Sequence, residues 1–66
     1  MEVPEKFLNR EVIIYLRNGR KIKGKITFIF PTFIEIDGVN AIGKQMITSI
    51  FLVNKENEKE VEDNEQ

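Results

Sequence analysis

The chain has 66 residues, of which 41% are hydrophobic and 32% are charged, and its net charge at neutral pH is −1. This length allows one small domain. Because the sequence holds no cysteine and no histidine, it excludes disulfides, thiolate or imidazole metal sites, a cysteine nucleophile and a histidine base, so we expect binding or assembly without a cofactor rather than an enzyme.

A short helix is the first predicted element, within residues 3–10. Pro4 suits a first helical turn, and Phe7 and Leu8 would face a core. A strand is predicted from Glu11 onward, and apolar residues occupy both of its faces. Val12, Ile14 and Leu16 share one face, and Ile13 and Tyr15 share the other.

A hairpin is predicted at Asn18-Gly19, because both residues tolerate the positive φ angle that such turns need. The returning strand, residues 20–30, extends ~36 Å if straight, whereas a globule of this length has a radius of gyration of roughly 11 Å. We therefore expect a sharp bend or bulge at Gly24, and Pro31 ends the strand. The even-numbered Ile22, Ile26, Phe28 and Phe30 should point inward, and the odd-numbered Lys21, Lys23, Lys25 and Thr27 outward.

Three shorter strands should follow, at residues 33–37, around residues 41–42 and at residues 47–53. In the first of them, Ile34 and Ile36 should point inward and Phe33, Glu35 and Asp37 outward. The predicted fold is mostly β. It comprises a short N-terminal helix and a five-stranded, strongly bent antiparallel sheet that forms a small barrel over residues 1–53, since closure removes sheet edges.

Charge divides the chain into two unlike parts. Residues 10–53 hold seven Lys and Arg against three Asp and Glu, a net charge of +4, and residues 54–66 hold two against six, a net charge of −4. With Val61 as its one aliphatic residue, the segment 54–66 is predicted to be a disordered acidic tail. A basic body favours a polyanionic partner, and the tail would either be solvated or compete with that partner.

Some apolar residues have no expected partner inside the predicted barrel. Residues 50–53 are hydrophobic on both faces, and such an exposed edge aggregates unless another copy pairs with it. Equivalent head-to-tail pairing of copies would close into a ring, which would also stabilise so small a domain. The unpartnered set is Ile13, Ile29, Met46, Phe51 and Val53.

No stretch resembles a signal peptide, and the longest apolar run, residues 12–16, is far below the ~18 residues of a membrane span. We therefore expect a cytoplasmic protein without a membrane partner, and the lack of cysteine agrees with that compartment.

Residues 12–26 resemble the first motif of the Sm-like (LSm) family, closest to its bacterial branch of Hfq RNA chaperones. The resemblance includes an aliphatic strand, the Asn18-Gly19 turn and the bend glycine Gly24, and residues 4–9 and 44–49 are similar to the family's short helix and second motif. It implies an SH3-like, Sm-like barrel in a homo-oligomeric ring of six or seven copies. It also implies binding of single-stranded A/U-rich RNA and an RNA-chaperone role in post-transcriptional regulation.

The resemblance further implies two RNA-binding faces. On the pore side, Phe33 falls where a family aromatic stacks on uracil, and Lys44 and Gln45 fall where a lysine and a histidine line the same pocket. The chain departs from the family at Pro31 and Gly43, where aspartate and tyrosine are usual. The residues that fall on the opposite face are Tyr15, Arg20, Ile22 and Ser49.

The residues themselves suggest phosphate contacts for Lys21, Lys23 and Lys25, which share one strand face. The alternative is that these lysines only deter edge aggregation. Phe33 and Tyr15 would equally suit ordinary packing. Residues 44–45 would equally suit a plain polar turn.

Two other readings stay open. The chain could instead be an oligomeric assembly module that docks protein partners without binding RNA. Glu35 and Asp37 form the close carboxylate pair of the body. Since no nucleophile or phosphate-cradling glycine loop accompanies them, we expect a solvated strand face rather than a catalytic or metal site.

Overall fold

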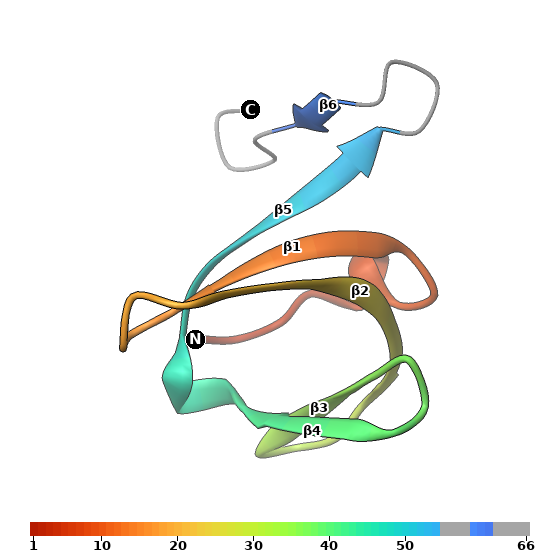
Figure 1. The fold of residues 1–66 in the computed structure, drawn as a ribbon. Coiled ribbons are helices and arrows are strands. Elements are labelled where there is room, and N and C mark those ends of the chain that lie inside the picture. The colour runs from red at the N-terminus through yellow and green to blue at the C-terminus, as the bar shows by residue number, and fades with distance from the viewer. Residues whose placement is uncertain (55–58, 62–66) are drawn as a thin grey trace.

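An antiparallel sheet accounts for most of the residues that the structure describes, 1–54 and 59–61 of a computed structural model. Its strands are β1 (Glu11–Leu16), β2 (Lys21–Ile29), β3 (Phe33–Ile36), β4 (Asn40–Gly43), β5 (Ile47–Asn54) and β6 (Lys59–Val61). Their order across the sheet is β4-β3-β2-β1-β5-β6, so β5 lies beside β1 rather than beside β4 (Figure 1). The five predicted strands correspond to β1 through β5.

Strand β2 is shared by the two halves of the sheet. Its first residues, Lys21 to Lys25, pair with β1, and the part from Ile26 onward pairs with β3. Figure 1 shows β2 curving from one partner to the other. Gly24 is buried close to this changeover, where a side chain would collide with β3. A glycine is thus required at residue 24 by the close approach of Ile36 and Asp37, whereas the bulge predicted there lies between Ile26 and Phe28.

The β1–β2 and β3–β4 hairpins depend on residues that accept a positive φ. Gly19 adopts φ 89° between β1 and β2, and the Arg20 amide donates a hydrogen bond to Asn18 Oδ1 over 3.0 Å. Between β3 and β4, Asp37 and Gly38 adopt φ 56° and 76°, which is typical of the turns that match strand twist. The Asn-Gly signal thus correctly predicts the first reversal.

The predicted closed barrel is not what the structure shows. Within the described residues, β4 pairs only with β3, and the opposite edge of the sheet is β6. A 3₁₀ turn, η2 (Lys44–Met46), follows β4 directly and leads into β5, which pairs with β1. Pairing between β4 and β5, which closure needs, therefore does not form in one copy.

The predicted N-terminal helix is also reduced, to the 3₁₀ turn η1 (Glu5–Phe7). Pro4 and Leu8 on either side have extended backbone angles, with ψ 145° and 132°. Because regular helix needs ψ near −42°, the turn cannot propagate. Phe7 is nevertheless buried, as expected.

The core occupies the inner face of the curved sheet and consists mainly of isoleucine. β-branched side chains suit strands, where they pack against cross-strand neighbours. The N-terminal segment adds two residues that cover one end of the core. The buried cluster is Val3, Phe7, Val12, Ile14, Ile26, Ile34, Ile36, Ile42, Ile47 and Ile50.

A bulge between Ile26 and Phe28 reverses the faces of β2 beyond it. Phe28 is 53% exposed, although the alternation predicts that it points inward. Ile29, predicted to lack a partner, instead packs against the core. Both predictions are wrong because an inserted residue shifts the period of two by one position.

Residues 54–66 were predicted to form a disordered acidic tail. The structure describes Asn54 as the last residue of β5 and places β6 against β5 through the pairs Leu52↔Val61, Val53↔Glu60 and Asn54↔Lys59. The remaining part of that prediction, residues 55–58 and 62–66, lies outside the described residues. The helical turns of the described chain are too short to cross a lipid bilayer.

Candidate functional site

The three residues assigned to the pore-side face come together around one open pocket of about 660 Å³. Phe33 begins β3 and is paired with Gly43 at the end of β4. Lys44 and Gln45 follow immediately in η2. The pocket is lined by Met1, Glu2, Pro31, Thr32, Phe33, Gly43, Lys44 and Gln45.

Hydrogen bonds to backbone atoms of η2 hold it in place from two sides. The Lys44 amide donates to the Thr32 carbonyl over 2.9 Å. On the other side, Arg17 Nε donates to the Gln45 carbonyl over 2.6 Å, and the Arg17 amide donates to the Met46 carbonyl over 2.8 Å. These bonds fix the backbone position from which the exposed Gln45 side chain projects. Sequence reasoning did not identify Arg17, which carries no local signal for this role.

The Lys44 side chain is mostly covered, with 13% of its surface exposed. Its Nζ lies 3.8 Å from Glu2 Oε1, and the Glu2 side chain is 95% exposed. An ion pair with so exposed a partner is weak and easily exchanged. Glu2 therefore holds the Lys44 ammonium only weakly at the pocket.

Three phenylalanine rings form a stacked column beside this pocket. The ring centroids of Phe28 and Phe30 lie 4.4 Å apart at 17° between planes, and those of Phe30 and Phe33 lie 4.5 Å apart at 22°. Phe33 points outward from β3, as predicted, whereas Phe30 was expected inward. The i, i+2 spacing of Phe28 and Phe30 before the Pro31-Thr32 turn was the available signal. The bulge between Ile26 and Phe28 turns Phe28 to the exposed face, where it stacks on Phe30.

The opposite face is only partly assembled as the resemblance implies. Tyr15 is paired with Ser49 on one side and with Lys21 on the other. Lys21 Nζ lies 5.8 Å from the centre of the Tyr15 ring, within cation–π range. Ile22, by contrast, is paired with the buried Ile14 and packs against the core. It therefore lies on the other side of the sheet from Tyr15.

The remaining residues of this face are solvent-exposed or apolar. Arg20 lies exposed in the hairpin loop, and Lys23 and Lys25 are exposed at positions two and four beyond Lys21 in β2. We call the surface formed by Lys21, Lys23 and Lys25 the lysine face. An apolar strip runs beside it. Ile13, paired with Lys23, is only 6% exposed, and Phe51 packs edge-on against Tyr15 at 5.5 Å.

The carboxylates of Glu35 in β3 and of Asp37 directly after it stabilise the fold. Asp37 Oδ1 accepts a hydrogen bond of 3.0 Å from the Lys25 amide, and Glu35 Oε1 lies 3.0 Å from the Thr27 hydroxyl. The same hydroxyl accepts a hydrogen bond from the Gly38 amide over 2.9 Å. These contacts fix the bulge and the β3–β4 turn. Among the described residues, no group of three or more acidic side chains could hold a metal ion.

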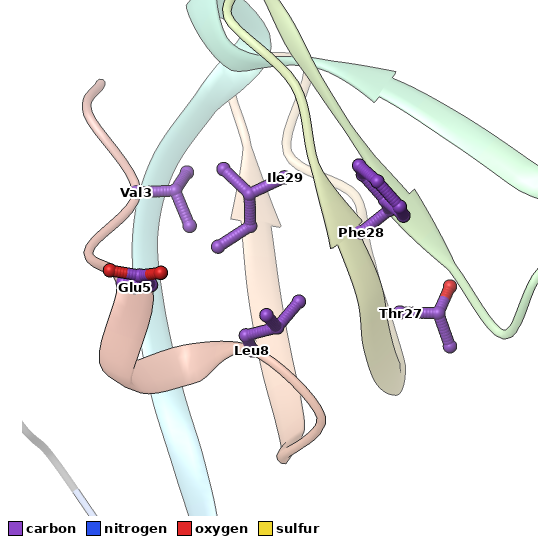
Figure 2. Close-up of a pocket in the computed structure, with 6 residues that line it drawn as sticks. All are labelled: Val3, Glu5, Leu8, Thr27, Phe28 and Ile29. Atoms are coloured by element: carbon purple, nitrogen blue, oxygen red, sulfur yellow. The ribbon is translucent and has the colours of Figure 1, made fainter.

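A second pocket, of about 410 Å³, lies between the N-terminal segment and the second half of β2. In Figure 2, Val3, Leu8 and Ile29 converge in it, with the Glu5 carboxylate at its margin. Thr27 and Phe28 complete the lining, although in Figure 2 their side chains stand on the other side of the strand from these three. The pocket is mostly apolar, and Glu5 and Thr27 are its polar lining residues.

Comparison of the chain with protein-family models, curated proteins and solved structures finds no match.

Proposed function

We propose that this chain is an Sm-like RNA-binding protein that assembles into a homo-oligomeric ring and binds single-stranded, A/U-rich RNA. One observation carries the proposal. Phe33, Lys44 and Gln45, which lie on two separate elements, converge on a single open pocket. The combination of an aromatic ring, a cation and an amide is what a nucleotide requires of a protein surface.

Each of the three residues has a distinct chemical role in this proposal. The free side of the Phe33 ring stacks on a base, which contributes ~1–3 kcal/mol per base with little sequence preference. Lys44 contacts phosphate, and the Gln45 amide both donates to and accepts from a base edge. One pocket binds weakly. Identical pockets in one assembly engage a single strand together and raise its effective affinity.

The edges of the sheet support assembly. The outer edge of β4 has no strand partner among the described residues, and unpaired edges add strands from other chains. Outward-facing Phe51 and Val53 of β5 are only partly covered. Pairing of one copy's β4 with another copy's β5 would cover the open β4 edge and bring the second copy close to Phe51 and Val53. The new strand would have to displace β6 from residues 52–54. Repeated head to tail, this contact closes into a ring. The resemblance to the Sm-like family is what suggests six or seven copies and RNA-chaperone activity.

A second candidate is a ring that docks protein partners and binds no RNA. The half-covered side chains of Phe51 and Val53 favour it, because apolar area, and aromatic residues in particular, are enriched at the centre of protein interfaces. The lysine face beside the apolar strip favours RNA instead, since three exposed lysines on one strand attract phosphate.

The two candidates are separated by measuring the binding of fluorescent oligo-U and oligo-A at two salt concentrations. The RNA proposal requires saturable binding that weakens as salt rises. If neither oligonucleotide shows salt-sensitive binding, the protein-docking candidate replaces it. The mass of the native assembly, measured in parallel, gives the number of copies.

A further inference from the structure

Phe28 is an exposed aromatic ring whose orientation is set by the stacked column. One side of its ring packs on Phe30, yet 53% of the residue is exposed. We propose that the uncovered side of Phe28 is a second base-stacking site for single-stranded RNA, distinct from the Phe33 pocket and selective for bases with an exocyclic amine. This inference rests on the proposed function and adds to it a base preference that the pocket does not provide.

The geometry of the column favours a planar ligand. Phe30 is stacked on both sides, at 4.4 and 4.5 Å, so it offers no ring face to a ligand. The stackable faces are the outer ones of Phe28 and Phe33, at the two ends of the column. Stacking on Phe30 already fixes the plane of the Phe28 ring. Binding of a base therefore costs little side-chain conformational entropy.

The polar groups beside Phe28 favour a base over the RNA backbone. Glu35 is the cross-strand partner of Phe28 and lies two residues from Phe33 in β3, so it shares the outer face with the column. Its Oε1 accepts a hydrogen bond of 3.0 Å from the hydroxyl of Thr27, the residue before Phe28. A carboxylate repels phosphate, but it accepts a hydrogen bond from the amino group of adenine or cytosine.

The expected base is therefore adenine in an A/U-rich strand. Uracil has no exocyclic amine and carries carbonyl oxygens, which a carboxylate does not favour. The Phe33 pocket differs in that its acidic lining residue, Glu2, is paired with a cation, Lys44. We accordingly expect the two ends of the column to differ in base preference, with oligo-A more sensitive to Phe28 than oligo-U.

The chain contains no tryptophan, so Phe28→Trp places a single fluorescent probe in the site. We expect oligo-A to quench its emission at concentrations that match binding measured by anisotropy, and oligo-U to quench it less. Phe28→Leu, which keeps an apolar side chain but removes the ring, should weaken oligo-A binding about fivefold or more. Phe28→Tyr should bind oligo-A as the parent does. Glu35→Gln should reduce the preference for oligo-A.

Three results are decisive. If oligo-A binds without changing the emission of the Phe28→Trp variant, and Phe28→Leu binds as the parent does, the inference is overturned while the proposed function stands. If Phe28→Leu lowers the mass of the assembly without changing RNA affinity at equal ring concentration, Phe28 is a contact between copies and the inference fails. If the parent chain binds neither oligonucleotide, the proposed function fails first and this site fails with it.

Discussion

A methyl group at Gly24 would stand 2.6 Å from Ile36 Cγ2, closer than any real contact between carbon atoms. The same position lies 2.8 Å from Asp37 Oδ2. Asp37 in turn accepts a hydrogen bond from the Lys25 amide. The absence of a side chain at residue 24 is therefore what lets β2 bend across the end of β3.

Gly24→Ala should lower the free energy of unfolding by about 1–3 kcal/mol, the usual cost of forcing extra volume into a packed site. Chemical denaturation monitored by circular dichroism measures it. Gly43→Ala is the matched control, because a Cβ there meets nothing within 4 Å and its φ is negative. Equal stability of the two variants would contradict the role of Gly24.

Ile34→Ala should destabilise the fold by about 2–5 kcal/mol, because the side chain is fully buried and its removal leaves a cavity. Val39→Ala removes a similar aliphatic group that is 79% exposed, and we expect a change within about 0.5 kcal/mol. The same denaturation experiment compares them. A small effect at Ile34 would mean that the core is not packed as described.

Phe33→Ala should weaken binding of uridine-rich RNA by about fivefold to a hundredfold, the range expected when one base stack is removed. The mass of the assembly should stay unchanged. Anisotropy of labelled oligo-U and mass measurement of the same sample provide both readouts. Loss of the assembly would instead assign Phe33 to packing, which its stack against Phe30 makes the natural alternative.

Lys44→Met should lower RNA affinity and reduce the dependence of log K on log salt, by about 0.7 for each phosphate that the lysine no longer neutralises. Methionine keeps the length of the mostly covered side chain and removes only its charge. Lys6→Met is the control, since Lys6 lines neither candidate face. If the salt slope is unchanged for Lys44→Met, the lysine does not bind phosphate.

Removing residues 55–66 should increase RNA affinity at low salt, because the deleted segment carries six acidic residues against two lysines. The truncation also removes the β6 partner of residues 52–54. Affinity and assembly mass must therefore be measured together. Identical affinity and release rates in the two chains would dismiss competition between the acidic segment and RNA.

Local patterns predicted the strands well, because a period of two and the Asn18-Gly19 turn are both visible in a short window. They did not predict the bulge after Ile26, since an inserted residue between apolar neighbours leaves the sequence looking regular. Phe28 and Ile29 were consequently assigned to the wrong faces. Whether the sheet closes depends on long-range pairing of β4, which no local pattern encodes.

The candidate site was likewise predicted only in part. Phe33, Lys44 and Gln45 were assigned from a family resemblance, and the β3–β4 hairpin places them together. For Ile22 the resemblance and the alternation disagreed, and the structure follows the alternation by packing Ile22 against the core. Neither the family resemblance nor the alternation predicted the phenylalanine column, because it depends on the bulge after Ile26.

β4 ends at Gly43, which lines the pocket together with Lys44 and Gln45. A chain that adds a strand along the outside of β4 must therefore finish beside that pocket and become part of its wall. Joining of copies and recognition of the ligand are then not separate events. We expect a compound that binds between β4 and the added strand to change both the number of copies in the assembly and the occupancy of the pocket.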